Sequence, residues 1–198
     1  MAKKESTFTN MVLTLFVVTA LSSLAAAAVY NITKEPIAEV QRLKQQKAIE
    51  QVMPGFTQLA RTAVMPETGP DSLVFFKGYR DTTELGFAVT TYTYIGYSGY
   101  VKMMVGFTPQ GIITNVKVID QKETPGLGTK MVDSMQLIHQ VVGKNPAEFK
   151  ISVKKDGGQV DAITAATISS RAFCDAVNRA YKSIDKIEKQ AINTGRVE

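Results

Sequence analysis

The sequence predicts an α+β protein in which one N-terminal transmembrane helix is followed by a small antiparallel sheet packed with helices. Three observations lead to this prediction. Residues 11–30 form a strongly apolar run, three segments rich in β-branched and aromatic residues lie between residues 85 and 119, and an amphipathic stretch begins near residue 168. With 198 residues, of which 44% are apolar and 21% charged, the chain has the composition of an ordinary folded protein.

The apolar run is long enough to cross a membrane. No charged residue occurs between Ser6 and Thr33, and about 20 residues at a rise of about 1.5 Å span about 30 Å. A cleavable signal peptide is the alternative, since Lys3 and Lys4 precede the run and alanines 25–28 offer a cleavage site. We expect a retained anchor, because the uncharged run is longer than the apolar core of a usual signal peptide.

The segment after the span is predicted to form a juxtamembrane helix. Pro36 stands where a helix can begin, apolar residues then recur at helical spacing, and Pro54 ends the pattern. Residues 57–72 contain prolines and a glycine and are expected to form a loop. The predicted organisation is an N-terminal segment at residues 1–10, a transmembrane helix at 11–32, a juxtamembrane helix at 33–56 and a globular domain at 57–198.

The globular part is predicted to begin with an antiparallel meander. Its strands are expected at residues 85–94, 100–107 and 112–119. Alternation of apolar and polar residues at 115–118 indicates one buried and one solvated face. The later elements are predicted as a helix around residues 129–142, a weaker strand at 149–153 and a last helix at about 168–189.

Cysteine, histidine and charge usage exclude several kinds of site. The single Cys174 excludes an intramolecular disulfide and a multi-cysteine metal site, and the single His139 excludes a bis-histidine haem from this chain alone. We expect Cys174 to be a small core residue, and His139 to lie on a helix surface or to be half-buried in packing. The formal charge of +5 is modest and no nucleic-acid-binding motif occurs, so we expect no nucleic-acid partner, but a lipid surface or an acidic protein.

Two stretches carry residues suited to a flat, phosphorylated ligand. The first is the loop at residues 123–128, whose proline and two glycines permit a tight turn and a close approach of backbone to ligand. The second, residues 161–170, places clustered hydroxyls ahead of the last helix, where free N–H groups attract phosphate. Ser169 and Ser170 are candidate hydroxyl donors. Each stretch also has an ordinary interpretation, as a connecting loop and as a threonine helix cap.

Together, the two stretches resemble the FMN-binding domain family of the Rnf complex G subunit and of the C subunit of the sodium-translocating NADH:quinone reductase. The resemblance covers the meander, the Glu-Thr-Pro-Gly-Leu-Gly loop and the signature Asp, two spacers, Ser/Thr, Gly, Ala, Thr. Asp161, Thr164, Ala166 and Thr167 fit this signature, and Ala165 stands where the family usually has glycine. The length of the chain favours the shorter Rnf-type subunit.

The resemblance implies an FMN joined by a phosphoester to Thr167, attached by a flavin transferase that recognises Asp161 and Thr164. It implies that the 123–128 loop lines the flavin ring. No catalytic and no metal-ligating residue is expected. The expected cofactor-binding residues are Glu123, Thr124, Gly126, Leu127, Gly128, Asp161, Thr164, Ala165, Ala166, Thr167, Ser169 and Ser170.

The implied function is that of an electron carrier in a membrane-bound, ion-translocating Rnf-type oxidoreductase of the ferredoxin/NAD couple. Such a protein is a redox component and not a complete enzyme; its implied partners are multi-span subunits, the flavin transferase and the lipid bilayer. The resemblance places it as a single-pass protein of the bacterial inner membrane, with residues 1–10 in the cytoplasm and the FMN domain, residues 57–198, on the periplasmic side. The basic residues around the span leave the orientation undecided. The alternatives are a component like the C subunit of the quinone reductase, a flavin-free membrane-anchored scaffold, and a flavin-binding sensor outside any pump.

Overall fold

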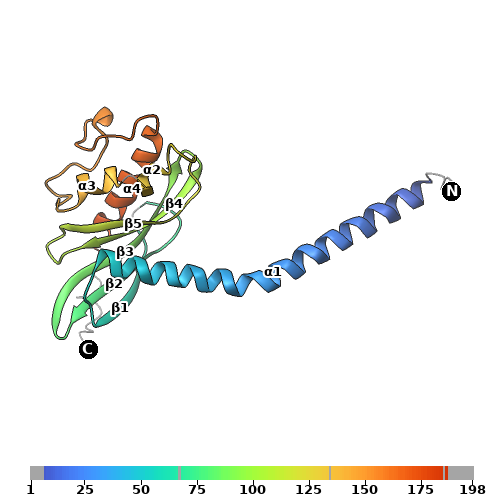
Figure 1. Cartoon of the computed structure of the whole chain (residues 1–198), viewed down its shortest axis with the longest axis horizontal. Helices are drawn as coiled ribbons and strands as arrows, with labels where there is room; N and C mark the ends of the chain where they lie inside the picture. Colours follow the sequence, from blue (N-terminus) through green and yellow to red (C-terminus); the bar gives the residue numbers. More distant parts are fainter. Residues whose placement is uncertain (1–6, 67, 134, 185, 187–198) are drawn as a thin grey trace. The chain divides into compact units, whose positions relative to one another are not determined.

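The computed structural model describes residues 7–66, 68–133, 135–184 and 186, and forms two compact units, Met1–Lys44 and Gln45–Glu198 (Figure 1). Helix α1, Phe8–Val52, makes up the first unit, and its C-terminal end belongs to the second. Among the described residues, α1 is the one helix that is long and apolar enough to cross a membrane, by length and composition.

Helix α1 is continuous, so Pro36 does not begin a new helix as expected but lies inside α1. A proline inside a helix removes one backbone hydrogen bond, while the residues on both sides can keep theirs. The helix ends at Val52, shortly before Pro54, where the sequence pattern predicts an end. The assignment of residues 11–32 to the membrane and 33–56 to a juxtamembrane segment stays a prediction.

The second unit is built on a five-stranded antiparallel sheet in which the strands lie side by side in sequence order. The strands are β1 (Gln58–Val64), β2 (Leu73–Arg80), β3 (Thr83–Gly96), β4 (Gly99–Phe107) and β5 (Ile113–Gln121). The predicted meander corresponds to β3, β4 and β5 and is confirmed. The loop predicted at residues 57–72 is wrong over its first half, because β1 lies there. This edge strand exposes nearly all its side chains, so no alternation marks it in the sequence.

Helical segments of the second unit cover both faces of the sheet. One face packs against α2 (Lys130–Asp133), α3 (Gln136–Val141) and α4 (Thr167–Lys182). The other face, with Phe76, packs against the end of α1 through Ile49 and Val52. Met103 and Met104, adjacent on β4, are fully buried in different clusters, as the alternation of strand side chains requires. The central strands are therefore buried on both faces, and their sequences do not alternate between apolar and polar residues.

The segment between the sheet and α4 differs from its prediction. The helix expected at residues 129–142 is divided into α2 and α3, because Met135 has a left-handed backbone (φ 50°) that a continuous helix does not allow. The strand expected at residues 149–153 is wrong. This segment instead forms an isolated bridge from Val153 to Val160 around a 3₁₀ turn, and the Ile151 carbonyl accepts a hydrogen bond from the side chain of Asn178 at 2.6 Å.

Two buried threonines of β3 hold α4 on the sheet. The hydroxyl of Thr91 donates to the carbonyl of Ala176 at 2.9 Å, and the hydroxyl of Thr93 donates to the carboxylate of Asp175 at 2.6 Å. Both threonines are fully buried. These bonds fix α4 along its axis and thereby place its first turn. The last helix is confirmed from Thr167 to Lys182, whereas the predicted residues 187–189 lie outside the described part of the chain.

Cys174 is a small core residue, as expected, while His139 is exposed on α3. Burial, followed by the nearby negative charges of Asp156 and Asp175, raises the pKa of the Cys174 thiol from 9.0 to about 12. The thiol therefore stays protonated in the folded domain at neutral pH, and its reactivity as a nucleophile is suppressed.

This pKa predicts a pH-dependent stability. Above pH 9 the unfolded chain releases the thiol proton while the folded domain keeps it, so the free energy of unfolding falls as pH rises toward about 12. Cys174→Ala should remove this part of the slope, although it also lowers stability at every pH by leaving a small cavity. Urea melts of both chains at about pH 8 and about pH 10.5 measure the difference. Parallel slopes in the two chains would contradict the assignment.

Candidate functional site

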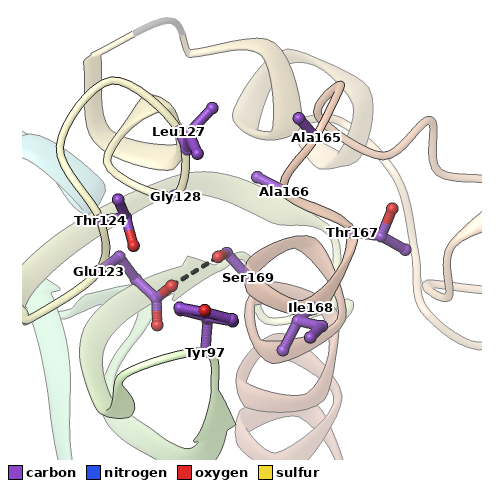
Figure 2. A pocket seen from close by; sticks show the side chains of 10 residues that line it. All are labelled: Tyr97, Glu123, Thr124, Leu127, Gly128, Ala165, Ala166, Thr167, Ile168 and Ser169. Atoms are coloured by element: carbon purple, nitrogen blue, oxygen red, sulfur yellow. Dashed lines mark hydrogen bonds between the residues drawn. The ribbon is translucent and has the colours of Figure 1, made fainter.

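A pocket of about 450 Å³ opens where the loop after β5, the β3–β4 hairpin and the first turn of α4 meet. This volume is typical of ligand pockets. Figure 2 shows the loop and the start of α4 facing one another. The lining residues are Tyr97, Glu123, Thr124, Leu127, Gly128, Ala165, Ala166, Thr167, Ile168 and Ser169. The fold thus brings together the two stretches that the sequence singles out.

Four of the predicted site residues do not line this pocket: Gly126, Asp161, Thr164 and Ser170. Two lining residues were missed by sequence reasoning. Tyr97 is 69% exposed at the tip of the β3–β4 hairpin, and Ile168 is 44% exposed in the first turn of α4. Their sequence signal is weak, consisting of an aromatic residue in a glycine-rich hairpin and an apolar residue among hydroxyls.

The 123–128 loop turns through a type II β-turn. The N–H of Leu127 donates to the carbonyl of Thr124 at 3.2 Å, Pro125 occupies the second position, and Gly126 follows with φ +75°. The hydroxyl of Thr129 accepts a bond from the N–H of Gly126 at 2.9 Å and closes the turn. The predicted tight turn is therefore confirmed. Gly126 shapes the loop from outside the pocket, while Leu127 lines it.

Glu123 is the buried acidic group of the pocket, with 4% of its surface exposed. Its Oε2 accepts the hydroxyl of Ser169 at 2.6 Å, drawn as the dashed line in Figure 2, and its Oε1 accepts the N–H of Ser98 at 3.2 Å. Gly128 leaves room for this arrangement, since a Cβ there would lie 2.7 Å from both Glu123 Oε2 and Ser169 Oγ. One carboxylate thus joins the loop, the hairpin and α4.

The first turn of α4 has no side-chain cap. Its N-cap residue is Ala166, which has no cap hydrogen bond, and Thr167 is the first residue of the helix. The interpretation of Thr167 as an ordinary helix cap is therefore wrong. A helix start of this kind presents backbone N–H groups and the positive end of the helix dipole to a ligand. Thr167 is half-buried and lines the pocket at this end.

The turn before α4 is strained and braced. Ala165 has φ +62°, a region that favours glycine, which explains why a glycine suits this position in the family that the sequence resembles. The side chain of Ser170 stabilises this turn through two hydrogen bonds. Its buried hydroxyl accepts the N–H of Ile163 at 2.9 Å and donates to the carbonyl of Ala166 at 2.9 Å. This hydroxyl is engaged within the domain and does not line the pocket.

Asp161 and Thr164 lie on the surface beside the pocket. The side-chain amide of Gln140 binds both backbone groups of Asp161: its Oε1 accepts the N–H at 2.6 Å and its Nε2 donates to the carbonyl at 3.1 Å. The carboxylate of Asp161 pairs with Lys154 at 2.8 Å. The segment is therefore presented in a fixed conformation that another protein can reach.

The residues present fit a flat cofactor that carries a phosphate. Tyr97, Leu127 and Ile168 supply apolar surface, and the start of α4 supplies donors for the phosphate. No group of three or more His, Cys, Asp and Glu residues within the described part of the chain is arranged to hold a metal ion.

Comparison with known proteins identifies related chains. The FMN-binding domain family matches residues 96–182, and the RnfG N-terminal region family matches residues 1–52. The G subunit of the ion-translocating oxidoreductase complex of Haemophilus influenzae (strain PittEE) is 32% identical over 173 residues, which are 81% of this chain and 82% of that protein. The protein of the same name from Erwinia tasmaniensis is 31% identical over 192 residues, 89% and 90% of the two chains.

The corresponding G subunit of Escherichia coli (strain K12) is 31% identical over 180 residues, which are 85% of this chain and 86% of that protein. Among solved structures, the crystal structure of Shewanella oneidensis NqrC is similar over 62% of each chain, with 21% identity and a TM-score of 0.43.

Substitution of either loop glycine should destabilise the domain, but for a different reason at each position. Gly128→Ala places a methyl group against Glu123 and Ser169, and we expect it to lower the free energy of unfolding by about 1–3 kcal/mol. Gly126→Ala has open space around it but a positive φ, which should cost about 1–2 kcal/mol. Gly126→Asn is the matched control, because asparagine tolerates this backbone better. Chemical denaturation measures all three; equal stability of the alanine and asparagine variants at Gly126 would contradict the strain.

Proposed function

Because the chain belongs to the G-subunit family of ion-translocating oxidoreductase complexes, an electron-transport family, and carries an FMN-binding domain, we propose that it relays electrons through an FMN bonded covalently to Thr167. The observation that carries this proposal is the position of Thr167. Its side chain belongs to the first turn of an uncapped helix and lines a pocket with the 123–128 loop. In the family that the sequence resembles, the last threonine of the signature bears the flavin phosphate.

The residues of the pocket divide between the two parts of the cofactor. A phosphate on Thr167 Oγ1 would lie at the N–H groups of the first turn of α4. The apolar side chains of Tyr97, Leu127 and Ile168 would cover the ring and exclude water from it. When bound, the flavin supplies the capacity to exchange one or two electrons. A covalent bond makes its retention independent of binding affinity.

We propose that a flavin transferase makes this bond. The Oγ1–P bond to Thr167 forms, the pyrophosphate bond of FAD breaks, AMP leaves, and the hydroxyl proton passes to the transferase. Asp161 and Thr164 are exposed, as recognition elements must be, and Gln140 holds the segment in place. Ala165 already adopts the φ that glycine would suit, so its methyl group does not abolish the turn.

The proposal extends to the surroundings of the protein. Helix α1 is long and apolar enough to serve as a single membrane span. As the family resemblance implies, the N-terminus would then lie in the cytoplasm and the FMN domain on the periplasmic side of the bacterial inner membrane. The partners are then the multi-span subunits of a complex that couples ferredoxin and NAD to ion translocation. The named relatives are subunits of an ion-translocating oxidoreductase complex, which supports a place for this chain in a multi-subunit assembly.

Thr167→Ala, produced together with the flavin transferase, should yield a folded but colourless protein. Thr167 is not a helix cap and alanine favours helix, so misfolding is not expected. Thr124→Ala is the matched control, since it removes another threonine of the same pocket and should keep the flavin. Intact mass and ultraviolet fluorescence of the denatured chain on a gel measure attachment. A flavin-sized mass on Thr167→Ala, or one that maps to Thr164, Ser169 or Ser170, would refute the assignment.

The proposed orientation is tested by labelling a cysteine on the exposed turn after Val153. Lys155→Cys should react with a membrane-impermeant thiol reagent once only the outer membrane is opened. Cys174 is buried and its pKa is raised to about 12, so it should not react with the reagent, and labelling reports the introduced cysteine. Labelling that requires a breached inner membrane would reverse the orientation. A mature chain that starts near Val29 would show that α1 contains a cleaved signal peptide.

A further inference from the structure

The buried carboxylate of Glu123 has no part in the proposed attachment of the flavin. We infer that its negative charge lowers the midpoint potential of the bound flavin. This inference rests on the proposed function, because it concerns a flavin held at Thr167. It assigns to Glu123 an electrostatic role that goes beyond lining the ring.

The first argument is that the position of the carboxylate is built by the fold. A Cβ at Gly96 would lie 2.5 Å from Oε1, and a Cβ at Gly128 would lie 2.7 Å from Oε2. Glycines on two separate segments therefore leave the space that the carboxylate occupies. Ser98 and Ser169 each donate one hydrogen bond to it, so both oxygens are held in place. A group that is fixed in this way exerts a field of constant direction on a ligand beside it.

The second argument is that, within the described part of the chain, no basic side chain forms an ion pair with this carboxylate. The ion pairs in the described part of the chain are Lys77–Glu84, Lys154–Asp161, Arg171–Asp156 and Arg179–Asp175, and none includes Glu123. The two partners of Glu123 are a neutral hydroxyl and a backbone amide. Among the described residues, Glu123 is also the one charged residue that is buried. Among the described residues, the carboxylate is therefore held by two hydrogen bonds and by no ion pair.

The third argument concerns the sign of the effect. An electron added to the flavin brings negative charge into a pocket that already contains a carboxylate, and like charges repel more strongly where water is excluded. The positive end of α4 acts in the opposite direction, but the phosphate would lie at that end and offset it. The net effect of Glu123 is to disfavour reduction of the ring.

A purely structural role of Glu123 makes a different prediction. If the carboxylate only joins the hairpin, the loop and α4, then loss of its charge and loss of the Ser169 hydroxyl should disturb the flavin in the same direction. If its charge acts on the ring, the two changes should have opposite signs. Glu123→Gln removes the charge and keeps the shape. Ser169→Ala keeps the charge and removes a dipole that partly offsets it.

The experiment uses the full chain, produced with the flavin transferase and purified in detergent. Flavin content is first measured by intact mass, and midpoint potentials then come from redox titration of the visible absorbance at constant pH. Glu123→Gln should shift the equilibrium for addition of one electron toward the reduced form by about tenfold, which corresponds to about 59 mV. Ser169→Ala should shift it the other way by a smaller factor.

Two further variants serve as controls. Glu123→Asp keeps the charge and should keep a low potential. Glu84→Gln removes a carboxylate that is partly exposed, pairs with Lys77 at 2.7 Å and lies at the end of β3 opposite the hairpin, so it should leave the potential unchanged. A shift in Glu84→Gln as large as that in Glu123→Gln would show that the effect comes from net charge and would overturn the local role.

The outcomes separate this inference from the proposed function. A wild-type chain without attached flavin would refute the proposed function itself. A flavinylated wild type whose potential is unchanged in Glu123→Gln would overturn the inference and leave the function standing. Should Glu123→Gln not fold, Ser169→Ala decides alone: a lowered potential supports the electrostatic role, and an unchanged or raised potential overturns it.

Discussion

The attachment of α4 to the sheet is the constraint on which the rest of this domain depends. Two buried threonine hydroxyls of β3 bind α4, one through a backbone carbonyl and one through Asp175. An unpaired buried hydroxyl or carbonyl is costly, so these bonds select one position of the helix along its axis. That position determines where the first turn of α4 meets the loop after β5. The pocket forms because one sheet holds both α4 and the loop after β5.

Small residues create the chemistry of the pocket by leaving space. Gly96 and Gly128 leave room for a buried carboxylate, and Gly126 permits the turn that carries Leu127 to the pocket. Ala166 leaves the start of α4 uncapped, since an alanine has no side-chain acceptor. A serine or aspartate at this position could bind the same N–H groups and compete with a phosphate. The site therefore depends as much on side chains that are missing as on those that are present.

The two electrostatic features of the pocket suit different parts of one cofactor. The positive end of α4 favours a phosphate, while the buried carboxylate of Glu123 faces the region lined by apolar side chains. The hydrogen bond between Ser169 and Glu123 connects these features, because Ser169 belongs to the first turn of α4. Under the proposed function, the first feature would position the phosphate of the flavin and the second would tune the midpoint potential of its ring.

The sequence by itself determined the features that depend on neighbours along the chain. The apolar helix, the meander of β3 to β5, the turn at Pro125 and Gly126, and the last helix all follow from periodicity and turn chemistry. The resemblance of two short motifs also selected most of the residues that line the pocket. Only the tertiary structure revealed edge strand β1, the cap position of Ala166 and the pocket residue Tyr97. It also decided that Ser170 braces a turn while Ser169 binds Glu123, although the two serines are adjacent in the sequence. Neighbouring residues on a helix point in different directions, so the partner of each depends on what the fold packs against that side.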